Sequence, residues 1–198
     1  MPALIYLHGF LSSPESAKAT ILKSWLSENR PDIEYCCPQL SAYSDETKFC
    51  LNNIVENYAD AIPMVVGSSL GGYWATWLSE SYDLPAVLIN PAVKPSIFLP
   101  GYVGVELENY YTEERYILRQ KDVDDLREVD TPYIKRVENY WLLAQTDDDT
   151  LDYRLSVQKY SGCRQLVEEG GNHSFENFER WLPEILNFLE QRRDQLLR

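Results

Sequence analysis

The strongest constraint on the fold is an alternation of short apolar runs with longer segments of helical periodicity. The runs are rich in β-branched and aromatic residues, as buried strands are, whereas the segments between them repeat apolar residues every three or four positions. This alternation is typical of βα units built on a parallel sheet. Six runs fit the description: Ala3–Leu7, Ile33–Cys37, Ile62–Val66, Ala86–Ile89, Tyr140–Ala144 and Arg164–Glu168.

Each predicted helix has one apolar stripe to bury and each strand has two faces, so helices are expected on both sides of the sheet. We therefore predict an α/β three-layer sandwich with a central, mostly parallel sheet of about six strands. Ser13 is expected to cap the first helix, with Pro14 in its first turn, and Pro183 to delay or kink the last helix. The stripes are Ala17, Ile21, Leu22, Trp25 and Leu26; Leu70, Trp74, Trp77 and Leu78; and Phe178, Leu182, Ile185 and Leu189.

Residues 91–135 do not follow the alternation of strand-like runs and helical segments. They contain prolines and glycines, then a tyrosine cluster, then a charged stretch. We predict one domain over residues 1–198, with residues 91–135 as an insertion or lid-like segment over the sheet edge. Tyr102, Tyr110 and Tyr111 either wall an acyl pocket or pack within the insertion, and the sequence favours neither reading.

Charge and hydropathy exclude several classes of partner. With 31 acidic and 18 basic residues the net charge is −13, which repels phosphate backbones and anionic lipids. We therefore expect no nucleic-acid and no membrane partner. The N-terminus carries no basic signal region, and no apolar run approaches the roughly 20 residues that span a bilayer, which predicts a cytoplasmic protein. Nothing in the sequence indicates the oligomeric state.

The cysteines and histidines indicate neither disulfides nor a metal centre. The four cysteines, which include the vicinal pair Cys36 and Cys37, lie in apolar segments and are expected to be reduced. Only two histidines are present, so the usual zinc spacings are absent. We expect no metal and no cofactor.

The sharpest motif is Gly67-Ser68-Ser69-Leu70-Gly71, between a predicted strand and a predicted helix. It fits the pattern G-x-S-x-G centred on Ser69, in which a serine projects from a tight, strained turn and the glycines let strand and helix close together. The bare pattern is common by chance, but its position after a strand and before a helix favours a nucleophile over a packing turn. Ser69 is therefore the candidate nucleophile.

Two histidines compete for the role of general base. His173 follows the last predicted strand, after Gly170 and Gly171, and its imidazole can take up a proton near neutral pH. His8 follows the first strand, and in this kind of fold the base comes after the acid along the chain. We therefore predict that His173 is the base and that His8 hydrogen-bonds and shapes its loop.

The third member of a triad should follow the strand that ends near Ala144. Four aspartates lie there, Asp147, Asp148, Asp149 and Asp152. Loop spacing favours Asp148 as the acid, while Asp152 suits the N-cap of the next helix. A cation site in Asp147–Asp149 is less favoured because consecutive side chains diverge. The backbone amides of Phe10 and Leu70 are the candidate oxyanion donors, since loops after neighbouring parallel strands meet at one edge.

These residues resemble the YqiA-like small esterases of the α/β-hydrolase superfamily. The resemblance covers nearly the whole chain and is carried by Tyr6–Phe10, Ser12–Pro14, Gly67–Tyr73, Ala75–Leu78, Asn90–Val93, Leu151–Arg154 and Gly170–His173. It implies a minimal α/β-hydrolase fold, with the triad at Ser69, Asp148 and His173. The chain departs from the family by having Asp147 where a glycine commonly precedes the acid.

The sequence therefore predicts a serine esterase that hydrolyses small-molecule acyl esters through an acyl-enzyme. Two alternatives stay open. One is a thioesterase or other acyl hydrolase with the same residues, because substrate choice depends on pocket shape. The other is a hydrolase-like protein that binds a ligand without turnover.

Overall fold

Six parallel strands form the central sheet of the computed structural model, which describes residues 1–58 and 61–198. The strand order is β2-β1-β3-β4-β7-β8, and the pairing register includes Leu4 opposite Met64 and Ser68 opposite Ile89. The strands are β1 (Ala3–Leu7), β2 (Glu34–Cys36), β3 (Met64–Ser68), β4 (Ala86–Ile89), β7 (Tyr140–Gln145) and β8 (Arg164–Glu168). The predicted sandwich and strand number are confirmed.

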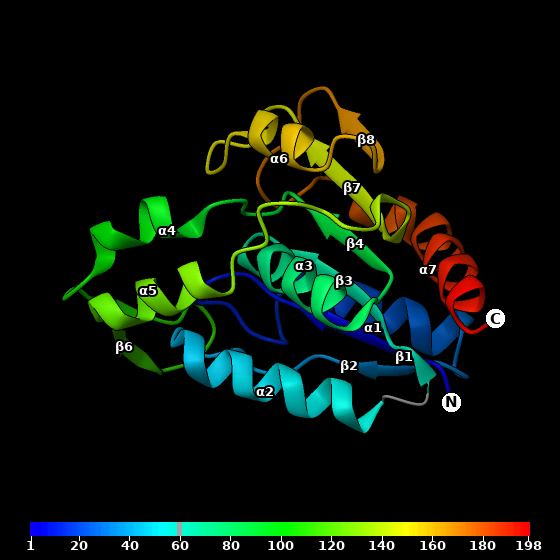
Figure 1. The fold of residues 1–198 in the computed structure, drawn as a ribbon, viewed down its shortest axis with the longest axis horizontal. Helices are drawn as coiled ribbons and strands as arrows, with labels where there is room; N and C mark the ends of the chain where they lie inside the picture. The colour runs from blue at the N-terminus through cyan, green and yellow to red at the C-terminus, as the bar shows by residue number, and fades with distance from the viewer. Residues whose placement is uncertain (59–60) are drawn as a thin grey trace.

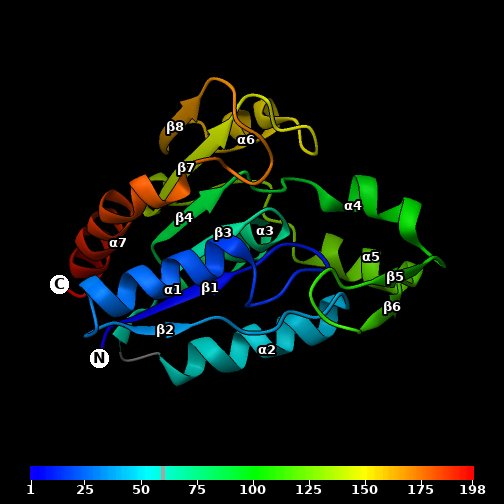
Figure 2. The same ribbon diagram turned by 180° about the vertical axis from the view of Figure 1, so that it is seen from behind.

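Helices cover both faces of the sheet. The helices α2 (Ser44–Asn57), α3 (Leu70–Tyr82) and α6 (Tyr153–Lys159) lie on the face toward the viewer in Figure 1. The opposite face, seen in Figure 2, is covered by α1 (Ala17–Asn29) and α7 (Leu182–Leu196). Alternate residues of each strand belong to two separate hydrophobic cores, one on each face of the sheet. Ile5 and Val65 pack under α2 and α3, whereas Leu4 and Met64 pack under α1 and α7. This alternation follows from the two-residue period of a strand.

The remaining elements connect these layers. They are α4 (Pro95–Phe98), α5 (Gln120–Glu128) and the antiparallel pair β5 (Glu106–Glu108) and β6 (Arg115–Ile117), with the 3-10 turns η2 (Leu99–Tyr102), η3 (Val137–Asn139) and η4 (Phe178–Trp181). None of the described helices is long and apolar enough to cross a membrane.

Several predicted boundaries were wrong. The third strand begins at Met64, not Ile62, because Pro63 has no amide to donate, and Ile62 has a φ of 45°. The second strand is shorter than Ile33–Cys37. Ser13 does not cap the first helix: its Oγ accepts from the Glu15 amide in a turn, and Ser16 takes the N-cap position.

The last helix begins where the proline predicts. α7 starts at Leu182 with Pro183 in its first turn, preceded by η4, so the missing proline amide falls where a helix has no partner for it. All four cysteines are free, as expected, and each is partly exposed.

The segment between β4 and β7 lies at the carboxyl end of the sheet. α4, α5 and β6 lie together at the end of the molecule opposite both termini (Figure 1). Buried side chains of this segment, including Leu107, Leu118 and Leu126, belong to the same core as β1 and β3. Asn109 fixes its tyrosine loop, because its Nδ2 donates to Ser12 O at 2.9 Å and its Oδ1 accepts from the Tyr111 amide at 2.8 Å.

The strand order reverses between β1 and β3. From β1 the chain passes to β2 on one side and then to β3 on the other. Loops after these two strands therefore diverge onto opposite faces and leave a crevice at the carboxyl edge, where open parallel sheets bind ligands.

Candidate active site

Ser69 lies on a strained turn between β3 and α3. Its backbone φ of 56° and ψ of −123° are rare for a residue with a side chain. Three backbone hydrogen bonds hold this conformation: the Ser69 amide donates to Ile89 O, and the Ser69 carbonyl accepts from the amides of Gly72 and Ala92. The surrounding structure thus fixes the turn and projects the hydroxyl from the sheet edge.

The two glycines of the motif allow the strand and helix to approach each other. A Cβ on Gly67 would lie 2.3 Å from Gly71 O, and a Cβ on Gly71 would lie 2.0 Å from Leu7 O. Real Cβ atoms do not come so close to backbone oxygens, so any side chain at either position would force α3 away from β1 and β3. The motif is therefore a packing requirement of the serine turn.

The structure brings Ser69, His173 and Asp148 into one hydrogen-bonded chain. His173 Nε2 lies 3.0 Å from Ser69 Oγ, and its Nδ1 lies 2.9 and 2.8 Å from the two carboxylate oxygens of Asp148. Because a carboxylate only accepts, Nδ1 carries the proton and donates it, which leaves Nε2 free to accept from the serine hydroxyl. This is the tautomer that a general base requires.

Asp148 is held as a buried carboxylate. Its side chain is 1% exposed, and Oδ1 also accepts from the amides of Thr150 and Leu151 at 2.9 and 2.8 Å. Burial by itself raises the pKa of Asp148, but the hydrogen bonds from His173 and the Leu151 amide outweigh it and hold the pKa below the usual value. The carboxylate can therefore orient and stabilise a protonated imidazole.

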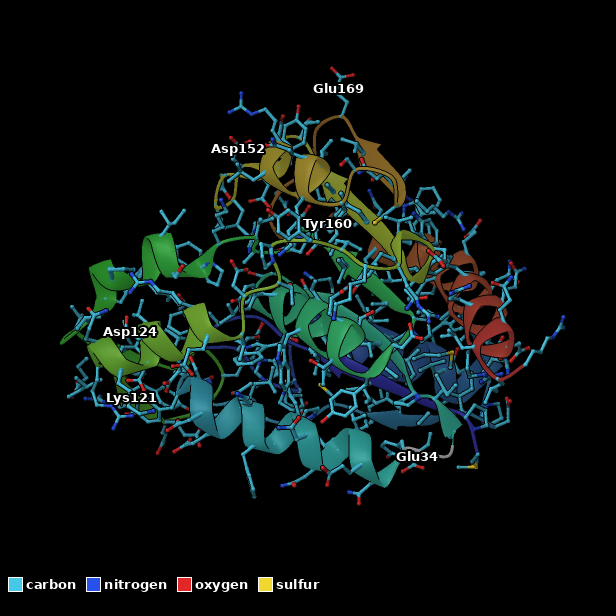
Figure 3. All side chains as sticks on the ribbon, viewed as in Figure 1. Glu34, Lys121, Asp124, Asp152, Tyr160 and Glu169 are labelled. Atoms are coloured by element: carbon cyan, nitrogen blue, oxygen red, sulfur yellow. The ribbon has the colours of Figure 1, made fainter. Side chains whose placement is uncertain are left out.

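The other three aspartates do not reach the imidazole. Asp147 and Asp149 are exposed. Asp152 caps α6, since its side chain accepts from the Arg154 amide, and it lies at the periphery of the molecule in Figure 3. Asp148 is the aspartate that loop spacing favoured, and the cap at Asp152 is confirmed.

Two buried side chains that the sequence reasoning missed hold the His173 loop. Asn90, at the end of β4, donates from Nδ2 to the carbonyls of Asn172 and His173 at 2.9 and 3.1 Å, and its Oδ1 accepts from the Gln145 amide. Gln145 Oε1 in turn accepts from the amides of Asn172 and Glu176. The signal available in the sequence was position, because each side chain directly follows or ends a central strand at the sheet edge.

The glycine before this loop is needed for its positive φ and for its close approach to Gln145. Gly171 has a φ of 75°, and a Cβ there would lie 2.0 Å from Gln145 Oε1. A side chain at this position would push Gln145 out of its hydrogen bonds with the His173 loop. Asn90 and Gln145 therefore hold the His173 loop at the sheet edge, and we call these two side chains and their hydrogen bonds the clasp.

His8 takes the structural role predicted for it. It is 2% exposed; its Nδ1 donates to Gly9 O at 2.9 Å, and its Nε2 accepts from the Leu40 amide at 3.0 Å. Burial lowers the pKa of His8, and the hydrogen bond to Gly9 opposes this only in part. The neutral ring ties the loop after β1 to the chain beyond β2.

The two candidate oxyanion donors flank Ser69. A Cβ on Gly9 would lie 3.3 Å from the Ser69 Cβ, so the loop that carries Phe10 packs against the serine turn. Leu70 is the first residue of α3. Within the residues described, neither the Phe10 amide nor the Leu70 amide donates to a protein acceptor. Both residues line the cavity that opens over Ser69.

This cavity has a volume of about 620 Å³, which is ample for a small organic ligand. Ser69 and His173 lie in its wall. Tyr102, Tyr110 and Tyr111 also line it, although Tyr110 is 76% exposed and the other two are about half exposed. Phe10 and Tyr102 form an aromatic pair with ring centroids 6.3 Å apart. The sheet edge and the tyrosine loop together border the open space above the hydroxyl.

One cluster of carboxylates has the spacing of a metal site. Among the described residues, Asp45, Asp122 and Asp125 bring ligand oxygens within 4.8 Å of one another, at the contact of α2 with α5. Lys121 already pairs with Asp45 and Asp125, and Arg119 pairs with Asp122. Lys121 lies on α5 in Figure 3, and these two cations offset two of the three negative charges of the cluster.

Comparison with known proteins gives a family match over most of the chain. The sequence model of the Uncharacterised protein family (UPF0227) matches residues 3–190. The UPF0227 protein YcfP of Salmonella paratyphi A is 25% identical over 189 residues, which cover 93% of this chain and 97% of that relative.

Solved structures share the fold at low sequence identity. Alpha/beta hydrolase domain-containing protein 10 from mouse superposes with a TM-score of 0.70 at 15% identity, covering 98% of this chain and 90% of that one. Est1E from Butyrivibrio proteoclasticus gives a TM-score of 0.65 at 20% identity, covering 96% and 88%. The α/β-hydrolase fold that the resemblance implied is confirmed.

Proposed function

Because the chain belongs to the UPF0227 family and has the α/β-hydrolase fold, we propose that it is a serine hydrolase that cleaves small-molecule acyl esters. The observation that carries this proposal is the hydrogen-bonded chain from Ser69 Oγ through His173 to Asp148 at the edge of an open cavity. A nucleophile, a base in the correct tautomer and an acid that orients the base are the parts that acyl transfer needs.

In the first half of the proposed reaction, Ser69 Oγ attacks the ester carbonyl carbon while His173 Nε2 takes the hydroxyl proton. The carbonyl oxygen becomes an oxyanion, which the Phe10 and Leu70 amides stabilise. The carbon–oxygen bond to the alcohol then breaks, and His173 returns its proton to the leaving alkoxide. The products of this half are a free alcohol and an acyl group on Ser69.

In the second half, a water molecule gives a proton to His173 Nε2 and attacks the acyl carbonyl. The second tetrahedral intermediate collapses with release of Ser69 Oγ, which regains the proton from His173. Asp148 keeps the Nδ1 proton throughout and stabilises the imidazolium formed in each half. The carboxylic acid leaves, and no cofactor enters the scheme.

The test uses Ser69→Ala with Ser68→Ala as the matched control, since the two serines are adjacent but only Ser69 has the glycine spacing of the motif. We expect Ser69→Ala to lose turnover of a chromogenic short-chain acyl ester by a factor of about a million. Ser68→Ala should keep activity within a few-fold, with both variants folded by circular dichroism. Retained turnover in folded Ser69→Ala would refute the proposal.

A parallel series compares an ester, a thioester and an anilide of the same acyl group by kcat/KM. Ester turnover well above that of the other two supports the proposed esterase. Preference for the thioester would keep the Ser69 mechanism but replace the substrate class.

A further inference from the structure

The residues that line the cavity over Ser69 include an aromatic set, which we call the aromatic side, and a polar set, which we call the polar side. Phe98, Tyr102, Tyr110 and Tyr111 form the aromatic side, all of them from the segment between β4 and β7. The polar side is formed where α1 begins, by Ser16, Ala17 and Lys18, together with Ser12 and Ser174. Together the two sets suit a ligand that has one apolar and one polar end.

Lys18 is the one lysine or arginine among the described residues that line this cavity, and no aspartate or glutamate lines it. The chain has 31 acidic residues and a net charge of −13, yet none of the acidic residues that the structure describes lines this cavity. The long-range field of the protein repels anions, so an anionic ligand here depends on a local positive group.

The start of α1 adds donors to the same wall. Ser16 holds the N-cap position, but its side chain makes no capping hydrogen bond and the first turn contains no acidic residue. Ser16 Oγ is buried without a hydrogen-bond partner within the described part of the chain. The amides of Ala17 and Lys18 likewise donate to no acceptor among those residues. An unpaired buried hydroxyl beside a helix N-terminus and an ammonium group is costly unless a ligand satisfies it.

Lys18 also has unused capacity to donate. Its Nζ donates to Ser174 O at 2.8 Å, which ties α1 to the His173 loop. An ammonium group has three donors, and the described residues accept from one of them. Burial lowers the pKa of Lys18 to about 8, while the negative charge of Asp148 opposes that shift. Lys18 is therefore largely charged at neutral pH, and an anion beside it would stabilise that charge.

We propose that the cavity selects ester substrates that carry a carboxylate, with Lys18 and the start of α1 binding that group while the aromatic side contacts the apolar part. This inference rests on the proposed function and names its substrate class. A single ammonium group matches a singly charged carboxylate better than a phosphate dianion, which favours forked arginines or several cations.

The test compares charged and neutral esters that differ in one group. One pair carries the charge on the acyl side: 4-nitrophenyl hydrogen adipate against its methyl ester. The other pair carries it on the alcohol side: 4-carboxyphenyl hexanoate against 4-(methoxycarbonyl)phenyl hexanoate. The measured quantity is the kcat/KM ratio of the charged to the neutral ester. Comparing this ratio between variants cancels the intrinsic reactivity of each ester.

The variants are Lys18→Met, Lys18→Arg and, as matched control, Lys23→Met, which removes an exposed lysine from the same helix. Loss of one charge-assisted hydrogen bond should lower the ratio about tenfold to a hundredfold in Lys18→Met for at least one pair. Lys18→Arg should largely restore the ratio, and Lys23→Met should leave it unchanged. A purely structural role of Lys18 would lower turnover of both esters equally and leave the ratio unchanged.

A binding measurement separates this inference from the proposed function. By calorimetry, hexanoate should bind the wild-type protein more tightly than the uncharged hexanamide does, and Lys18→Met should abolish that difference. An unchanged kinetic ratio in Lys18→Met, with neutral esters still cleaved in a Ser69-dependent way, would overturn the inference and leave the proposed function standing. A wild-type protein that cleaves none of the esters, but shows a binding difference that Lys18→Met abolishes, would overturn the proposed function and leave the carboxylate site standing. Equal binding of hexanoate and hexanamide to the wild-type protein would overturn the inference whatever the turnover.

Discussion

Replacing Asp148 by asparagine changes one oxygen to an amide nitrogen and tests the role of this residue with little change in shape. The remaining oxygen can still accept from the amides of Thr150 and Leu151, which hold it at 2.9 and 2.8 Å. The new NH₂ group would face His173 Nδ1, which now donates to the carboxylate at 2.8 Å. Two donors cannot pair. The retained Oδ1 lies 2.9 Å from Nδ1 but already accepts from two backbone amides, so we expect Nδ1 to accept from the new NH₂ group and the imidazole proton to move to Nε2.

That tautomer places a proton between Nε2 and Ser69 Oγ, which are 3.0 Å apart. Nε2 can then no longer accept the serine proton. In serine hydrolases with this arrangement the same change lowers kcat by about ten-thousandfold, which corresponds to about 5.5 kcal/mol of transition-state stabilisation. We expect a loss of this size for Asp148→Asn, with a folded protein and a nearly unchanged KM.

The assay is kcat on a chromogenic acyl ester, with Asp147→Asn, Asp149→Asn and Asp152→Asn as controls. None of the three control carboxylates contacts His173 among the contacts of the described residues, so each control should stay within about threefold of wild type. An Asp148→Asn variant with a tenth or more of wild-type activity would refute this reasoning. A loss of similar size in one of the controls would reassign the acid.

Two further predictions concern the His173 loop and the stability of the protein at low pH. Asn90→Asp keeps the shape of the side chain but cannot donate to the carbonyls of Asn172 and His173. We therefore expect kcat to fall about a hundredfold and the melting temperature to drop. An unchanged kcat would show that Asn90 does not hold the His173 loop in place. The pKa of Asp148 in the folded protein lies below the usual value of 3.8. The ionised carboxylate therefore stabilises the folded protein fully above pH 3.8, and this contribution is lost as the pH falls through the folded-state pKa. The difference in unfolding free energy between wild type and Asp148→Asn should therefore shrink from about pH 5 to pH 2, and a constant difference would contradict the assignment.

Local spacing was enough to predict the serine turn. The pattern around Ser69 can be recognised within five consecutive residues. A side chain at Gly67 is excluded by Gly71, four residues away, whereas a side chain at Gly71 is excluded by Leu7 of β1, a contact that the sequence does not show. The position of His173 after the last strand followed from chain order. Asp148 could be favoured but not fixed, since which of four neighbouring carboxylates turns inward depends on the hydrogen bonds of a single loop.

Features that depend on tertiary contacts could not be predicted from the sequence. α2 was not predicted, because its inward face comprises Thr47, Leu51 and Val55 on an otherwise polar segment, with Phe49 exposed. The strands β5 and β6 have three residues each, too few for a period to be recognised. The Asn90 and Gln145 clasp joins loops that lie far apart in the sequence, so composition around either residue carries no sign of it.

Active-site labelling shows directly whether Ser69 is a nucleophile that His173 activates. The protein is treated with a fluorophosphonate, digested, and its peptides are analysed by mass spectrometry. We expect one adduct, on Ser69, that is absent from Ser69→Ala and that forms much more slowly in a His173→Ala variant. A folded wild-type protein that remains unlabelled, or that carries the adduct on another residue, would contradict this expectation.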